Sequence, residues 1–180
     1  MKNLLILMTL NFSMMCGILS AQTQPQIEDA IKKLTDFAGI DCESDHPAYS
    51  SSSYQLKFES ASPSTLIHVS CPAGAYSTLD YFATLGSSNN LNIIAFAVPV
   101  IDEKSKVIGW SAETSLTNGS FDEKKSIISF MAAGSGNGST YVAGDYRLKN
   151  VNFFDGFKLV KFVQDKSIVK DEVITIFEVK

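Results

Sequence analysis

Short apolar segments with strand-like alternation, separated by turn signals, restrict the fold of this 180-residue chain more than any other feature. Beyond Gly39, apolar residues alternate with polar neighbours, as in half-buried strands, and Asn-Asn, Asn-Gly and Asp-Gly pairs separate the segments. The pattern predicts a mainly β protein, an antiparallel β-sandwich or a barrel-like sheet. The predicted strands lie at residues 54–58, 67–71, 92–98, 106–110, 126–131, 140–148, 151–154, 157–163 and 172–179.

Two of these segments carry sharper expectations. Residues 92–98 are a nearly continuous apolar run, which is typical of a central strand buried on both faces. Asp155-Gly156 lies between two apolar runs and predicts a two-residue hairpin turn. That turn would place Phe154 opposite Phe157.

One segment ahead of the strands has helical periodicity instead. Pro25 suits the first turn of a helix, and Gly39 suits its end. Between them, one face is apolar and the other is charged. The apolar positions are Ile27, Ala30, Ile31, Leu34, Phe37 and Ala38. Because the charged face is mixed in sign rather than basic, we expect an N-terminal amphipathic helix packed on the sheet rather than a helix at a membrane surface.

The first 21 residues have the pattern of a signal peptide. Lys2 precedes an apolar run at residues 4–10, and Ala21 ends a short run of small residues suited to cleavage. Polar residues interrupt the apolar stretch, which disfavours an uncleaved membrane anchor. We therefore expect a signal peptide at 1–21, a single globular domain at 22–180, and a periplasmic or secreted location.

Cys42 and Cys71 are the two cysteines beyond the predicted cleavage site. In an oxidising compartment such a pair predicts a disulfide, worth about 3–4 kcal/mol for a loop of about 30 residues. His46 and His68 lie near the two cysteines, so a zinc site is the alternative. A strand at residues 66–71 would point His68 and Cys71 to opposite faces, so we expect a disulfide and neither a metal nor another cofactor.

Charge and motif content exclude several classes of function. The chain has 15 Lys and Arg against 19 Asp and Glu, a net charge of −4, so it offers no basic field for nucleic acid. The glycine-rich segment at residues 134–138 lacks the lysine and helix of a phosphate-binding loop. No serine lies between two glycines in the spacing of a nucleophile elbow.

The two histidines leave one catalytic hypothesis open. His46 precedes Pro47 in a predicted loop, and His68 lies in a predicted strand, where a hydrogen-bonded structural role is usual. A Ser-His-Asp arrangement stays open, because triads assemble across a fold rather than along the chain. A cleft that holds either histidine beside Ser and Asp would favour a hydrolase acting on envelope material.

Asn118 and Asn137 each begin an Asn-Gly-Ser sequence that matches the glycosylation sequon. Both also lie where hairpin turns are expected. A turn therefore explains these Asn-Gly pairs without a glycan.

The stretch Val69-Ser70-Cys71-Pro72-Ala73-Gly74-Ala75-Tyr76-Ser77 resembles the Cys-x-x-Gly-Ala-Tyr-Asn segment of a family of bacterial periplasmic proteins of unknown function. Short motifs follow in the order of that family, and the resemblance covers residues 69–160. These motifs lie at residues 116–118, 121–122, 129–130, 134–138, 144–146 and 155–160. The family usually carries Gly-Asp-Cys-Gly where this chain has Gly136-Asn137-Gly138-Ser139. The resemblance implies an envelope protein and no particular mechanism.

Together, these features favour an exported, non-catalytic binding or inhibitory module over an enzyme. An acidic protein meets a basic partner faster, so we expect an envelope or extracellular protein with a basic surface as partner. Candidate binding residues are Trp110, Phe154 and Phe157, an aromatic patch at a hairpin tip. The alternative is that the helix or a second sheet covers these aromatic residues as core.

Overall fold

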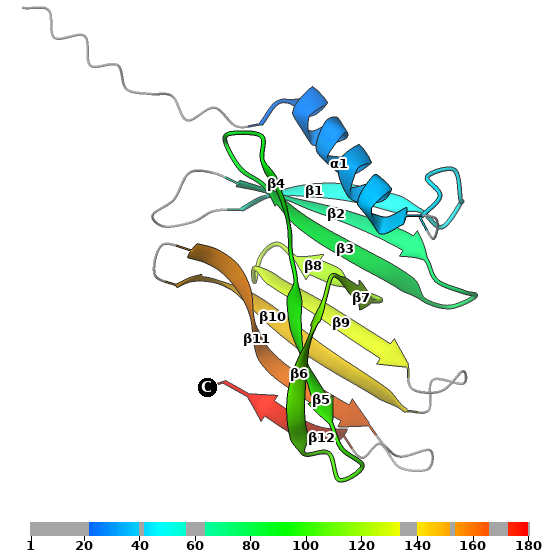
Figure 1. Ribbon diagram of the computed structural model, residues 1–180, viewed down its shortest axis with the longest axis vertical. Coiled ribbons are helices and arrows are strands. Elements are labelled where there is room, and N and C mark those ends of the chain that lie inside the picture. The colour runs from blue at the N-terminus through cyan, green and yellow to red at the C-terminus, as the bar shows by residue number, and fades with distance from the viewer. Residues whose placement is uncertain are drawn as a thin grey trace, which may run out of the picture.

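Twelve strands and one helix make up the part of the chain that this computed structural model describes, residues 22–39, 42–56, 64–133, 140–151, 154–165 and 173–179 (Figure 1). The predicted signal peptide at 1–21 and the glycine-rich segment at 134–138 lie outside the described residues. Every strand pairing is antiparallel, and none of the sheets in the described ranges closes into a barrel. The elements are α1 (Gln24–Ala38), β1 (Ser50–Leu56), β2 (Ser64–Pro72), β3 (Thr78–Leu85), β4 (Leu91–Ile93), β5 (Phe96–Ile101), β6 (Val107–Glu113), β7 (Ser115–Thr117), β8 (Ser120–Asp122), β9 (Ile127–Ala133), β10 (Tyr141–Val151), β11 (Phe154–Asp165) and β12 (Val173–Glu178).

Helix α1 begins and ends where its sequence signals indicate. The backbone N–H of Thr23 donates to the side chain of Gln26 over 2.7 Å, and Pro25 lies in the first turn. Gly39 ends the helix in the left-handed region, at a φ of 80°. Leu34 is fully buried against the sheet. Among the described residues, no helix combines the length and apolar character needed to span a membrane.

The first sheet has the strand order β1-β2-β3-β4, and β7 also pairs with β3. Its face towards α1 forms the helix-side core, which includes Ile67, Val69 and Ala83. The predicted disulfide is confirmed there: Cys42 and Cys71 are joined, with their Cα atoms 4.8 Å apart. The disulfide thus ties the segment after α1 to the end of β2.

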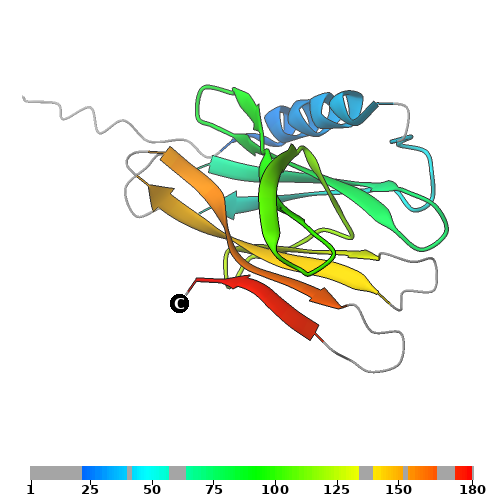
Figure 2. The ribbon, with the colours of Figure 1, turned by 60° about the horizontal axis from the view of Figure 1, so that its bottom comes forward.

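The second sheet has the strand order β12-β11-β10-β9-β8. Figure 2 shows α1, the first sheet and the second sheet one above the other. The opposite face of the first sheet and the second sheet contribute to one further hydrophobic cluster, the shared core. Its fully buried side chains include Leu66, Phe82, Phe96, Ile128, Tyr146 and Phe162. The first sheet is therefore buried on both faces.

Strands β5 and β6 form a two-stranded ribbon, and their position corrects the prediction for residues 92–98. That run is not one central strand, because Leu91–Ile93 form β4 of the first sheet and Phe96–Ile101 form β5 of the ribbon. The chain changes sheet here because Phe96 packs beside Tyr146 of β10, with ring centroids 4.9 Å apart. An apolar run gives no local sign of such a change.

The hairpin between β10 and β11 corrects the predicted turn at Asp155-Gly156. Asp155 pairs with Asn150 and Gly156 pairs with Lys149, so both residues lie within β11 rather than in a turn. Residues 152–153 are outside the described residues. Leu148 stands opposite Phe157, and both side chains pack against the shared core. A turn at residues 155–156 would break this register, so the burial of the paired side chains outweighs the local turn preference.

Replacing Leu34 by Ala should lower the free energy of unfolding by about 2–5 kcal/mol, because the side chain is fully buried between α1 and the first sheet. Phe37→Ala is the matched control on the same helix and should cost less, since Phe37 is 47% exposed. Chemical denaturation of both variants measures the difference. A Leu34→Ala loss no larger than that of Phe37→Ala would contradict the docking of α1.

Candidate functional site

A polar cluster lies on the face of the first sheet that contributes to the shared core. Strand register places Ser52, His68 and Phe82 side by side across β1, β2 and β3. Side chains on one face of a strand recur at every second residue, so Asp80 shares this face. The His68 Nε2 and Asp80 Oδ1 atoms are 2.8 Å apart. Sequence reasoning named His68 but missed both Ser52 and Asp80.

Asp80 is the most enclosed member of the cluster, with 1% of its side chain exposed. Its Oδ2 atom accepts hydrogen bonds from the Thr78 hydroxyl at 2.6 Å and from the Gly119 backbone N–H at 2.7 Å. Burial alone would raise the pKa of Asp80, but hydrogen bonds from His68, Thr78 and Ser70 and the charge of His68 outweigh it, and the pKa lies below its ordinary value. The carboxylate is therefore held in its charged form.

His68 connects Asp80 to Ser52. Its ring stacks on Phe82 with centroids 4.4 Å apart, and its Nδ1 atom lies 3.4 Å from the Ser52 hydroxyl. Ser52 in turn donates to the Tyr54 hydroxyl over 3.1 Å. The structure thus places His68 between a serine hydroxyl and a carboxylate, which is the arrangement of a nucleophile, a base and an orienting carboxylate. The Ser52–His68 distance is longer than the reach of about 2.6–3.2 Å in an assembled nucleophile–base pair.

The Asn118-Gly119 link carries the chain from β7 in the first sheet to β8 in the second. It is therefore not the hairpin turn that the sequence predicts. A Cβ atom on Gly119 would lie 2.8 Å from the Asp80 Cβ, so only glycine allows this approach. The Asn118 amide accepts from the Thr78 N–H and donates to the Met131 carbonyl, each over 3.0 Å. Both ends of this amide are thus engaged without a glycan.

His46 takes no part in the cluster. It lies exposed in the turn between α1 and β1, and its Nδ1 atom accepts from the Ala48 N–H over 3.1 Å. His68 is therefore the histidine that the structure brings beside Ser and Asp. No group of three or more His, Cys, Asp or Glu side chains that could hold a metal ion occurs within the described ranges.

The predicted binding residues lie at separate places. Trp110 on β6 is 54% exposed, and its ring meets Phe177 of β12 edge-on at 6.3 Å. Phe157 is half-buried and meets Phe121 of β8 edge-on at 6.1 Å. Since β8 and β12 are the opposite edges of the second sheet, Trp110 and Phe157 do not form one patch. Phe154 begins β11, but its side chain lies outside the described part.

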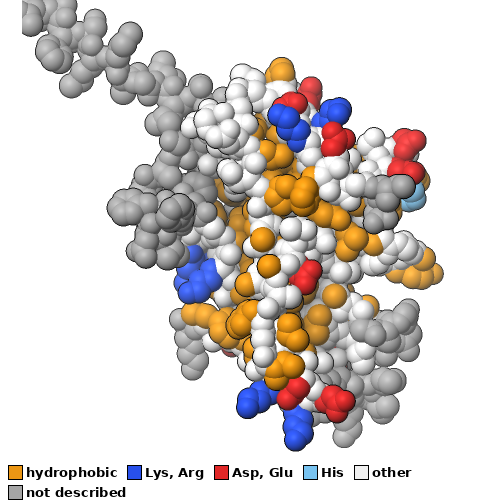
Figure 3. Space-filling model, viewed as in Figure 1, with side chains coloured by type: hydrophobic (Ala, Val, Ile, Leu, Met, Phe, Trp, Pro, Cys, Tyr) orange, Lys and Arg blue, Asp and Glu red, His pale blue; other side chains and the backbone are white. Residues whose placement is uncertain are grey.

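An exposed apolar surface covers the ribbon. Val100 is 42% exposed, but it pairs with Gly109 whereas Trp110 pairs with Pro99, so Val100 and Trp110 lie on opposite faces of the ribbon. Ile108, which is 65% exposed, lies two residues from Trp110 on β6. On the side of the molecule viewed in Figure 1, where the ribbon lies in front, Figure 3 shows hydrophobic side chains down the middle and acidic and basic side chains gathered mainly at the two ends. We call Ile108 and Trp110 the ribbon surface.

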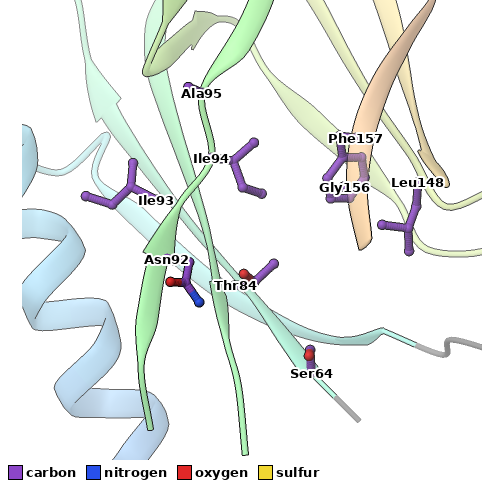
Figure 4. A pocket seen from close by; sticks show the side chains of 9 residues that line it. All are labelled: Ser64, Thr84, Asn92, Ile93, Ile94, Ala95, Leu148, Gly156 and Phe157. Carbon is purple, nitrogen blue, oxygen red and sulfur yellow. The ribbon is translucent and has the colours of Figure 1, made fainter. Parts of the chain in front are cut away.

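A cavity of about 340 Å³ opens between the first sheet and the β10–β11 hairpin (Figure 4). The first sheet lines it with Ser64, Thr84 and Asn92, and the hairpin lines it with Leu148 and Phe157. Phe157 is thus a predicted binding residue that lines a cavity, rather than part of an exposed patch.

A search of protein-family models, of curated proteins and of solved structures finds no match to this chain. The resemblance of residues 69–160 to a periplasmic family therefore stays a prediction.

Asp80→Asn should lower the free energy of unfolding at neutral pH by about 2–3 kcal/mol, because the charged hydrogen bonds of a buried carboxylate are lost. The depressed pKa of Asp80 stabilises the fold above the unfolded value near 3.9, and this contribution disappears as the pH falls through the folded value. The stability difference between wild type and variant should therefore narrow in acid. Urea denaturation between neutral and acidic pH measures it.

Asp122→Asn is the matched control, since the Asp122 carboxylate forms a surface ion pair with Lys125. This variant should change the stability little. A constant gap between wild type and Asp80→Asn down to the lowest pH would show that the charge of Asp80 does not stabilise the fold.

Proposed function

We propose that the protein is an exported, non-catalytic binding module that contacts a partner protein through the ribbon surface. The observation that carries the proposal is the exposure of Ile108 and Trp110, two residues apart on β6 of a two-stranded ribbon. Large apolar side chains gathered on a surface are typical of protein contacts, and tryptophan is among the strongest contributors to binding energy.

The export part of the proposal has three supports. Residues 1–21 have the pattern of a signal peptide, and the Cys42–Cys71 disulfide suits an oxidising compartment. The resemblance to a periplasmic family agrees with both. The disulfide is consistent with either a periplasmic or a fully secreted location.

We further interpret the two five-stranded sheets as the layers of a β-sandwich, with α1 on the outer face of the first sheet. The shared core, with side chains from both sheets, supports this interpretation. In such an arrangement the ribbon lies across the open side, where Tyr146 of β10 donates to the Ala97 carbonyl of β5 over 3.1 Å. The ribbon is thus held to a rigid support, which favours a preformed binding surface.

The partner that we propose is an envelope or extracellular protein with a basic surface. The chain carries a net charge of −4, which speeds encounter with a positively charged protein. The apolar centre of the ribbon surface would then supply most of the affinity.

Trp110→Ala should abolish capture of this partner from envelope extract while leaving the melting temperature nearly unchanged, because Trp110 is largely exposed. Met131→Ala is the matched control, since Met131 is an apolar side chain on β9 that is 49% exposed. Quantitative mass spectrometry of proteins retained by each immobilised variant measures the loss. The captured protein should be basic, and its capture should weaken as salt increases.

Two results would contradict this proposal. One is equal capture by wild type and Trp110→Ala. The other is equal loss in Trp110→Ala and Met131→Ala, which would show a general effect of apolar surface rather than a site.

A hydrolase is the second candidate function, and the Ser52–His68–Asp80 cluster is the observation that favours it. In this mechanism the Ser52 hydroxyl would attack an ester or amide carbonyl and pass its proton to His68 Nδ1. The bond to the leaving alcohol or amine would then break as that group takes the proton from His68, and water would hydrolyse the acyl-Ser52 intermediate. Asp80 would hold the His68 Nε2–H and stabilise the charged ring. The cluster holds these three groups but has a long Ser52–His68 distance of 3.4 Å.

Our binding proposal predicts that a fluorophosphonate probe does not label Ser52. The Ser52 hydroxyl donates its hydrogen bond to Tyr54, and His68 is largely enclosed, with 13% of its side chain exposed. Ser53→Ala is the control for Ser52→Ala, because Ser53 lies on the opposite face of β1. Stoichiometric labelling that Ser52→Ala abolishes and Ser53→Ala retains would instead establish the hydrolase.

A further inference from the structure

We propose that the cavity between the first sheet and the β10–β11 hairpin binds a neutral small molecule that carries hydroxyl groups, an uncharged sugar in chemical class. This site is separate from the ribbon surface and does not depend on the proposed protein partner. The lining of the cavity, with one polar wall and one apolar wall, carries the inference.

The polar wall comes from three neighbouring strands of the first sheet. Thr84 of β3 stands directly opposite Asn92 of β4 in the strand register. Ser64 lies on the same face at the start of β2, two residues before Leu66, which pairs with Thr84. Two hydroxyls and one amide therefore line the cavity from adjacent strands.

These three side chains make no hydrogen bond to any other group in the part of the chain that the structure describes. Each of them can both donate and accept hydrogen bonds. A sugar hydroxyl has the same property, so a ring with several hydroxyls could pair with all three at once.

The apolar wall comes from the β10–β11 hairpin and from the link between β4 and β5. Leu148 and Phe157 form a directly opposite pair across the hairpin. Figure 4 shows Ile94 pointing towards them from the other side, whereas Ile93 points towards the helix. The C–H face of a sugar ring could pack on this wall while its hydroxyls meet the polar wall.

The wall is also preformed. The Ile94 N–H donates to the Phe82 carbonyl over 2.9 Å, which fixes the link beside β3. Phe157 packs edge-on against Phe121 and against the shared core. A site that is already ordered loses little conformational entropy when the ligand binds.

Charge and size narrow the class of ligand further. No charged side chain is among the described residues that line the cavity, so an ionised ligand would lose hydration without gaining a partner. A purely apolar ligand would leave the two hydroxyls and the amide unpaired. The volume of about 340 Å³ falls within the range of small-molecule sites.

The test uses the purified mature protein and three neutral disaccharides, maltose, cellobiose and N,N′-diacetylchitobiose, with saturation-transfer and titration NMR. At least one of them should bind, and Thr84→Val and Asn92→Ala should each weaken its binding by about tenfold or more. Thr84→Val replaces one hydroxyl by a methyl group at a half-buried position, and Asn92 is exposed, so neither variant should unfold the protein. Asn90→Ala, an exposed asparagine in the neighbouring turn, should leave the affinity unchanged.

Two further probes test the proposed chemistry. Cellobiouronic acid has nearly the shape of cellobiose and carries a charge, so it should bind at least tenfold more weakly than cellobiose if cellobiose is the sugar that binds. The neutral apolar dye N-phenyl-1-naphthylamine should not compete with the bound sugar. Trp110→Ala should retain sugar binding, so failure of the ribbon proposal and failure of this one are distinguishable.

Several results would overturn the inference. One is the absence of binding by all three disaccharides at about 10 mM. Another is binding that neither Thr84→Val nor Asn92→Ala weakens, which would place the sugar elsewhere. Preferential binding of the apolar dye at this cavity, or equal binding of the charged disaccharide, would show that the polar wall does not select the ligand.

Discussion

The buried carboxylate of Asp80 fixes the point at which the chain passes from the first sheet to the second. It joins His68 of β2, Thr78 of β3 and the Gly119 N–H of the β7–β8 link. A buried charge without these partners would cost several kcal/mol, so the four groups require one another. Asn118 adds hydrogen bonds to both sheets beside them. The ribbon surface and the cavity are both built from strands whose relative position depends on this β7–β8 link between the sheets.

Local signals were enough to predict α1, the Cys42–Cys71 disulfide and most of the strands, because caps, cysteine count and alternation act over short distances. They were not enough for β3, which pairs with β2 on one edge and with β4 and β7 on the other. Asp80 interrupts its apolar pattern, and only its partners from other strands explain why a carboxylate is buried there. Its position within an apolar run was nevertheless a usable signal, because a charge in such a run needs partners. The register of the β10–β11 hairpin was missed for a related reason, since the long-range burial of Leu148 and Phe157 sets it.

The candidate sites differ in how far a sequence can show them. His68 could be named because histidine is rare here, but the serine beside it could not be chosen among many. Trp110 could be named as the single tryptophan. The cavity could not be foreseen, because its walls come from strands far apart in the chain and its neutral residues form no motif.

The first sheet separates two hydrophobic cores that share no buried side chain. The disulfide and α1 belong to one of them, and the cavity lies on the other side with the second sheet. Reduction of the disulfide would therefore act on the cavity only through the first sheet, including Ile93 of β4, which packs against the helix-side core and lines the cavity. A protein built in this way can loosen its helix layer in a reducing environment while the second sheet and the cavity keep their shape.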